Sequence, residues 1–236
     1  MAKNNADNTG FPVNVSAGGT GVSSVAAYNV LVAGTTSTSP LQVVPNGASG
    51  MVLTSQGAGN PPYFAAVPGK ITLLKTLTAS NSSSLTFTAT YLTSAFTTYL
   101  LLVNDINSGS SSAQLQMTWS TNNGGSYLAT GYQGGINYFA YNFSGGITNV
   151  NSTTFAPLTH VIGTANFLLN GAIYLYFPVG AVACYRGEIR NNTSTGALYY
   201  MLGGTNSSTS TINNIKLAYS TGVITSGSFS LYGVQQ

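Results

Sequence analysis

The stretch Ala113-Gln-Leu-Gln-Met-Thr-Trp119 alternates apolar and polar residues, and the turn-forming residues Asn122-Asn-Gly-Gly125 follow it. Successive side chains of a β-strand point to opposite faces, so this alternation predicts a strand with one buried face. Asn and Gly tolerate the positive φ angles that tight hairpin turns require, which makes the second stretch the clearest hairpin signal in the chain. Together the two stretches predict antiparallel β-structure.

Similar stretches recur from Gly69 to the C-terminus, separated by turns at roughly the 8 to 12 residue spacing of a sandwich or barrel. No window shows a sustained apolar period of 3.6 residues, so helix is expected to be nearly absent. We therefore predict that residues 69–236 form an all-β domain, an antiparallel, jelly-roll-like β-sandwich of about ten to twelve strands. The predicted strands are Ile71–Leu77, Ser84–Thr88, Thr98–Val103, Ala113–Trp119, Ser126–Leu128, Gly135–Phe143, Thr153–Ile162, Ala172–Phe177, Val182–Ile189, Ala197–Leu202, Ile212–Tyr219 and Ser228–Val234.

Residues 1–68 have a different character. They are rich in Gly, Ala, Ser, Thr and Pro, and their apolar pieces are short: Tyr28–Val32, Leu41–Val44 and Met51–Leu53. Strands of this length bury little surface within one chain, and a segment so poor in bulky residues is not expected to fold alone. It either stays flexible or takes its core from neighbouring copies.

The composition excludes several classes of function. Only 4% of the 236 residues are charged, whereas an ordinary soluble domain has about 25%. A net charge of +3 is too sparse to bind nucleic acid, and one His, one Cys and three acids offer little to a general acid–base enzyme. The glycine-rich loops lack the spacing of a nucleotide fingerprint, so no cofactor is expected. No apolar stretch is long enough for a signal peptide or a membrane span, which predicts a soluble protein made in the cytosol and no membrane insertion.

The few reactive side chains are each expected to be structural. A triad or metal site at His160 would need residues that the sequence hardly offers, so His160 is interpreted as a packed or interface histidine. Cys184 lies in an apolar strand and is interpreted as a small buried hydrophobe. Since the chain also has little charge with which to protect its edge strands, burial of those edges in an oligomer is the simplest expectation.

The densest charge cluster is Arg186-Gly-Glu-Ile-Arg190. Residues i, i+2 and i+4 of a strand share a face, so Arg186 and Arg190 should flank Glu188 on one side of the sheet. One interpretation is a surface ladder of small energetic value. The other is an anchor for a carboxylate-bearing sugar or a partner chain, because a guanidinium can bind a carboxylate in a bidentate manner.

Tyrosine is the most informative residue type. Tyr132, Tyr138 and Tyr141 lie in the Gly-rich stretch 131–146, where loops or short strands should meet solvent, and Tyr199 and Tyr200 precede two glycines. A tyrosine ring with its hydroxyl suits stacking against a sugar. These five residues are therefore candidate receptor-binding residues, and the alternative is that they fill the core or a subunit interface.

Three segments resemble the stem module of tailed-bacteriophage tail-fibre proteins: Gly18-Gly-Thr-Gly21, Ala27-Tyr-Asn-Val-Leu-Val32, and Gly50-Met-Val-Leu-Thr-Ser-Gln-Gly-Ala-Gly-Asn-Pro-Pro-Tyr63. Met51, Gln56 and Tyr63 depart mildly from the usual residues Gln, Asn and Trp. The sandwich is similar to the C-terminal domains of such fibres through Ser120–Tyr127 and Ser226–Gly233.

The resemblance implies a homotrimeric fibre of the virion. Residues 1–17 would anchor it to other virion proteins, residues 18–68 would form a thin intertwined stem, and residues 69–236 would form the head. It further implies binding of host-surface glycan without cleavage, since Asp105 and Glu188 are the only acids in the head and a glycosidase needs two acids flanking the bond. The alternative is a capsid decoration or head fibre with a structural role.

Overall fold

The computed structural model describes residues 22, 24–36, 39–67, 69–140, 145–160, 168–193 and 196–235. The chain divides into two compact units, Met1–Pro68 and Gly69–Gln236. The expected anchoring peptide, residues 1–17, and the candidate residue Tyr141 lie outside the described residues. No helix occurs among the described residues, and accordingly none of them forms a helix that could cross a membrane.

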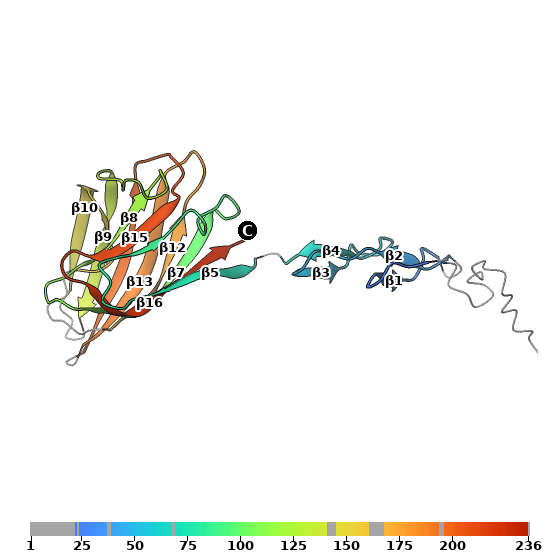
Figure 1. Cartoon of the computed structure of the whole chain (residues 1–236), viewed down its shortest axis with the longest axis horizontal. Coiled ribbons are helices and arrows are strands. Elements are labelled where there is room, and N and C mark those ends of the chain that lie inside the picture. Colours follow the sequence, from blue (N-terminus) through green and yellow to red (C-terminus); the bar gives the residue numbers. More distant parts are fainter. Residues whose placement is uncertain are drawn as a thin grey trace, which may run out of the picture. The chain divides into compact units, whose positions relative to one another are not determined.

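The first unit contains two separate antiparallel hairpins, whose strands carry the labels β1 to β4 in Figure 1. The first hairpin pairs β1 (Val30–Val32) with β2 (Gln42–Val44), and the second pairs β3 (Met51–Thr54) with β4 (Tyr63–Ala66). Three of these strands fall on the apolar pieces singled out in the sequence. The fourth, β4, was not predicted.

These hairpins have almost no core. In the described part of this unit, one hydrophobic residue, Val44, is buried. Other large hydrophobic side chains are exposed: Val25, Tyr28, Leu31, Val43, Met51, Val52, Leu53 and Tyr63. In β3 three consecutive apolar residues are exposed, so apolar side chains lie on both faces of this two-stranded ribbon.

The second unit is an antiparallel β-sandwich, as predicted, and its strands run side by side in Figure 1. The larger sheet has eight strands in the order β10-β9-β14-β13-β12-β7-β16-β5. Their bounds are β5 Ile71–Thr78, β7 Thr98–Ser108, β9 Tyr132–Ala140, β10 Gly145–Thr153, β12 Leu168–Tyr176, β13 Ala183–Thr193, β14 Gly196–Asn206 and β16 Ile224–Val234.

The smaller sheet has four strands in the order β11-β8-β15-β6. Their bounds are β6 Leu85–Phe87, β8 Leu115–Ser120, β11 Ala156–Pro157 and β15 Asn214–Tyr219. The twelve strands described in this unit agree with the predicted number.

The core lies between the two sheets, and Trp119 of β8 is at its centre. Its ring packs against three aromatic rings of the second unit, with centroid distances of 5.5 Å to Tyr132, 5.2 Å to Phe177 and 6.0 Å to Tyr185. Leu115 and Met117, the alternate residues of the same strand, are also fully buried. The alternation in the opening stretch therefore marks the side of β8 that faces the larger sheet.

The predicted tight turn after β8 is confirmed, but the strand expected after it is not. Asn123 and Gly124 have φ angles of 59° and 83°, and Gly125 N donates to Asn122 O at 3.2 Å. Residues 126–128 form a loop, in which Leu128 N donates a backbone hydrogen bond to Trp119 O. The prediction of a strand at Ser126–Leu128 is wrong, because both edges of β8 are occupied by β11 and β15 and leave no partner for a third strand there.

Candidate binding surface on the eight-stranded sheet

The eight-stranded sheet has an inner face against the four-stranded sheet and an outer face turned away from it. In β13 the alternate residues Tyr185, Ile189 and Asn191 are buried on the inner face. Arg186 and Arg190 are exposed on the outer face with Glu188 between them. The strand spacing predicted this shared face correctly.

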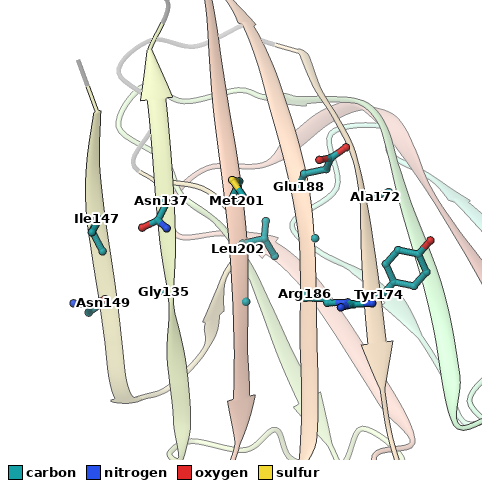
Figure 2. A pocket seen from close by; sticks show the side chains of 12 residues that line it. Gly135, Asn137, Ile147, Asn149, Ala172, Tyr174, Arg186, Glu188, Met201 and Leu202 are labelled. Atoms are coloured by element: carbon teal, nitrogen blue, oxygen red, sulfur yellow. The ribbon is translucent and has the colours of Figure 1, made fainter. Parts of the chain in front are cut away.

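An open depression of about 740 Å³ lies on the outer face, and we call it the trough. Two neighbouring cross-strand rows of residues line it. The first row is Asn149, Gly135, Gly203, Arg186 and Tyr174, and the second row is Ile147, Asn137, Met201, Glu188 and Ala172. Figure 2 labels these residues, except Gly203, and they come from five adjacent strands, β10, β9, β14, β13 and β12.

At one point in the trough two glycines, which have no side chains, lie opposite each other on neighbouring strands. Gly135 and Gly203 are register partners on β9 and β14, so bare backbone forms the floor at this point. A Cβ added to Gly203 would meet no atom closer than 3.5 Å, and therefore the space above this residue is open. Any ligand in the trough can approach the backbone of the sheet here.

Arg186 forms one wall of the trough and is held by aromatic rings. Its guanidinium carbon lies 5.9 Å from the ring centroid of Tyr174 and 5.6 Å from that of Tyr176. Figure 2 shows the Arg186 side chain extending toward Tyr174. Contacts of this kind attract a cation to the face of a ring and restrict the motion of a long side chain.

Glu188 is held by a tyrosine on the neighbouring strand. The Tyr199 hydroxyl donates to Glu188 Oε2, and this hydrogen bond raises the pKa of Tyr199. Tyrosine is protonated at neutral pH, so Tyr199 is the donor of this hydrogen bond. Its cross-strand partner is Arg190, and neither residue lines the trough, so both lie one row beyond it.

Two of the candidate tyrosines are core residues. The solvent exposure expected for Tyr132 is wrong, and the alternative, that the tyrosines fill the core, holds for Tyr132 and Tyr200. Tyr132 and Tyr200 are each 1% exposed. The Tyr132 hydroxyl accepts the backbone N–H of Trp119 at 2.8 Å, and burial raises its pKa to about 12. Burial also raises the pKa of Tyr200. Both rings point inward because the pairing register of β9 and β14 gives them inner-face positions, so neither can contact a receptor.

Tyr138 is partly buried at the margin of the core. It shares the inner-face register of Tyr132 and Ile136, and its ring lies 4.8 Å from the ring of His160. This contact agrees with the interpretation of His160 as a packed histidine. Of the seven candidate residues, the structure thus brings Tyr199, Arg186 and Arg190 together on the outer face.

Cys184 is exposed, which corrects the expectation of a buried residue. Ala183 and Tyr185 on either side of it are buried, so the alternation of β13 turns the thiol to the outer face. Cys184 precedes Arg186 by one outward position on the same strand.

Sequence reasoning missed several residues of the trough, among them Tyr174, Asn137 and Asn149. Tyr174 could have been found, because its neighbours Ile173 and Leu175 mark the inner face of a predicted strand. The two asparagines are in Gly- and Asn-rich strands that carry no alternation from which to read a face.

Among the residues described, no group of three or more His, Cys, Asp or Glu side chains is placed to hold a metal ion. The surface offers rings, amides, one guanidinium and one carboxylate, which is chemistry suited to binding through hydrogen bonds and stacking. No protein-family model, curated protein or solved structure matches the chain.

Proposed function

We propose that this chain is the structural fibre protein of a tailed-bacteriophage virion, that it forms a homotrimer, and that its head binds host-surface glycan without cleaving it. The observation that carries the proposal is the trough on the outer face of the eight-stranded sheet. It combines an open backbone floor with the aromatic ring of Tyr174 and exposed amides on a β-sheet. A largely apolar pocket with a few polar groups is the usual form of a small-ligand site, and tyrosine suits the faces of sugars.

The first unit supports assembly with other copies of the chain. An isolated two-stranded hairpin is marginally stable in water, and each hairpin here leaves large apolar side chains exposed. Leu53 of β3 and Leu31 of β1 are each more than two-fifths exposed. Packing against the same segment of two further copies would cover both faces of the ribbon, and the stem-like motifs of residues 18–63 favour this arrangement.

The positions of the two acids in the head favour binding over hydrolysis. One oxygen of Asp105 accepts from Asn170 Nδ2 at 2.9 Å, and one oxygen of Glu188 accepts from Tyr199. The strands that carry them, β7 and β13, are separated by β12, which places the strands about 10 Å apart across the sheet. The acids are also offset along the strands, because Glu188 pairs with Ala172 whereas Asp105 contacts Asn170, so the two residues are farther apart than the strands. A glycosidase needs its two carboxyl groups about 5 to 9.5 Å apart on either side of the scissile bond. The proposal accordingly includes no catalysis and no cofactor.

In this proposal the remaining partners are other virion proteins, which residues 1–17 would contact, and neither nucleic acid nor a membrane is bound. The test is adsorption. Host cells incubated with the purified full chain are expected to lose adsorption of the virus that encodes it, and periodate oxidation of the cell-surface sugars is expected to abolish binding of the chain. Binding that survives periodate would contradict a glycan receptor. Absence of any binding, together with antibody labelling on the capsid, would favour a capsid decoration protein instead.

A further inference from the structure

We infer that the trough is a subsite for an acidic saccharide and that Arg186 binds the carboxylate of the sugar. The inference rests on the proposed glycan binding and adds the chemical class of the ligand. Its residues are Arg186 with Tyr174 and Tyr176, the floor formed by Gly135 and Gly203, and Glu188 one row away.

The first argument is the distribution of charge. The whole chain has nine charged residues, and both of its arginines and its single glutamate are consecutive outward residues of β13. Elsewhere in the chain the exposed surface is formed largely by uncharged polar residues, so solubility does not explain why three charged residues are gathered on this strand. Arg186 is the one of the two guanidinia that lines the trough, and the natural complement of a guanidinium is an anion.

The second argument is the state of the Arg186 guanidinium. The two tyrosine rings fix its position, and among the described residues no acceptor is bonded to it. A guanidinium has five N–H donors in a planar fork, and a carboxylate accepts two of them side by side. The rings therefore preorganise the side chain while its donors remain free for a ligand.

The third argument is the fit of a sugar ring beside the fork. Gly203 is the cross-strand partner of Arg186, and the open space above its backbone leaves room for a ring to lie on the sheet. Gly135, the next residue of the row, lies beside the Asn149 side chain, whose Oδ1 would be 3.2 Å from a Cβ added there. Glu188 lies two residues along β13, about 6.7 Å from Arg186, and can accept sugar hydroxyls at the far side of that ring. The exposed amides of Asn137 and Asn149 supply further hydrogen bonds on the opposite wall.

The presence of Glu188 favours a carboxylate over a phosphate monoester. Arg186 is the one cation among the residues that line the trough, and Glu188 is in the adjacent row. A single guanidinium balances a singly charged carboxylate. A doubly charged phosphate would keep an uncompensated charge close to the Glu188 carboxylate, which costs free energy.

The experiment measures binding of the full chain to an immobilised panel of saccharides. The panel contains polygalacturonate and polysialate, the same polymers after chemical reduction of their carboxylates, a phosphate-bearing polymer, and the neutral polymers dextran and mannan. Binding is expected to one or more acidic polymers and is expected to fall at least tenfold after carboxyl reduction. Hydrogen bonds to a charged partner contribute about 1.5 to 3 kcal/mol, which corresponds to a loss of about ten- to a hundredfold.

Three variants locate the carboxylate. Arg186→Gln is expected to weaken binding by about ten- to a hundredfold, and Arg186→Lys, which keeps the charge but loses the fork, by an intermediate factor. Arg190→Gln removes the same charge one row outside the trough and is the matched control, expected to stay within about threefold of the unmodified chain. Both arginine side chains are exposed, so the melting temperatures of the three variants are expected to be unchanged.

The outcomes separate this inference from the proposed function. Equal binding before and after carboxyl reduction, stronger binding of the phosphate-bearing polymer, or equal losses from Arg186→Gln and Arg190→Gln would overturn the acidic subsite while glycan binding stands. No binding to any polymer of the panel or to the sugars of host cells would overturn both. Self-association through the outer face, seen as a mass that falls on Arg186→Gln, would likewise overturn the inference and assign the face to a second copy.

Discussion

Two adjacent glycines of β14 provide a sharp test of the trough, because they face opposite sides of the sheet. Gly203 is on the outer face, where an added Cβ would meet no atom within 3.5 Å. Gly204 is on the inner face, where an added Cβ would lie 2.4 Å from the carbonyl oxygen of Gln133 and 2.9 Å from the ring of Tyr185. The same substitution at the two positions should therefore separate binding from stability.

Gly203→Val is expected to change the free energy of unfolding by no more than about 1 kcal/mol, since valine favours strands and the space is open. Its two methyl groups would stand on the floor of the trough where a sugar ring would lie. Binding of the best saccharide is therefore expected to weaken at least tenfold, about 1.4 kcal/mol. Gly204→Val is expected to lower the free energy of unfolding by about 1 to 3 kcal/mol, because backbone and ring must move, and to leave the affinity of the folded protein unchanged.

The assay pairs urea unfolding with titration calorimetry on the full chain, using both variants and the unmodified protein. The reasoning would be refuted if Gly203→Val bound as tightly as the unmodified chain, since the trough would then not hold the ligand. It would also be refuted if the stability losses of the two variants were equal, since the assignment of inner and outer faces would then be wrong.

Four further predictions concern the core, the thiol and the assembly. Trp119→Ala removes the central ring of the sandwich and is expected to lower the free energy of unfolding by about 3 to 5 kcal/mol in urea titrations; a loss below about 1 kcal/mol would contradict its central place. Tyr99 and Tyr132 are buried, and burial raises the pKa of each to about 12, so their protonated forms stabilise the folded state. The free energy of unfolding is expected to fall between pH 10 and pH 12 by on the order of 2 kcal/mol for each tyrosine. A free energy of unfolding that does not change over this pH range would argue against their burial. Cys184 is exposed and should react completely with a maleimide in the native protein at pH 8, whereas protection until unfolding would show that something covers the outer face. Light scattering should give a mass about three times 24.3 kDa, and Leu53→Asp in the first unit should reduce it toward the monomer while the melting transition of the sandwich persists; an unaltered trimer would refute the role of the hairpins.

Alternation predicted the sandwich well where apolar and polar residues take turns. The opening stretch gave β8 and its buried face, and the spacing of Arg186 and Arg190 gave their shared outer face. Strands built from Gly, Asn and Thr carry no such pattern. The strand β10 (Gly145–Thr153) was missed for this reason, since its pairing with β9 depends on backbone hydrogen bonds that any residue can make.

The face of a side chain could not be read where the register was unknown. Tyr132 was expected where a loop or short strand meets solvent, but it begins β9 on the inner face, because β9 starts earlier than the apolar residues indicate. A shift of one residue reverses every side chain of a strand. The trough itself could not be predicted, because it forms where residues of five strands meet, and their order in the sheet is set by long-range pairing.

The position of a bound saccharide is the most direct test of the central claim, that the outer face of the eight-stranded sheet is the glycan-binding surface. The measurement is a structure of the full chain with the saccharide that binds best in the panel. The account predicts ligand density over Gly135 and Gly203 with a carboxylate against Arg186. Density on the four-stranded sheet, or an outer face buried against a neighbouring copy, would contradict it.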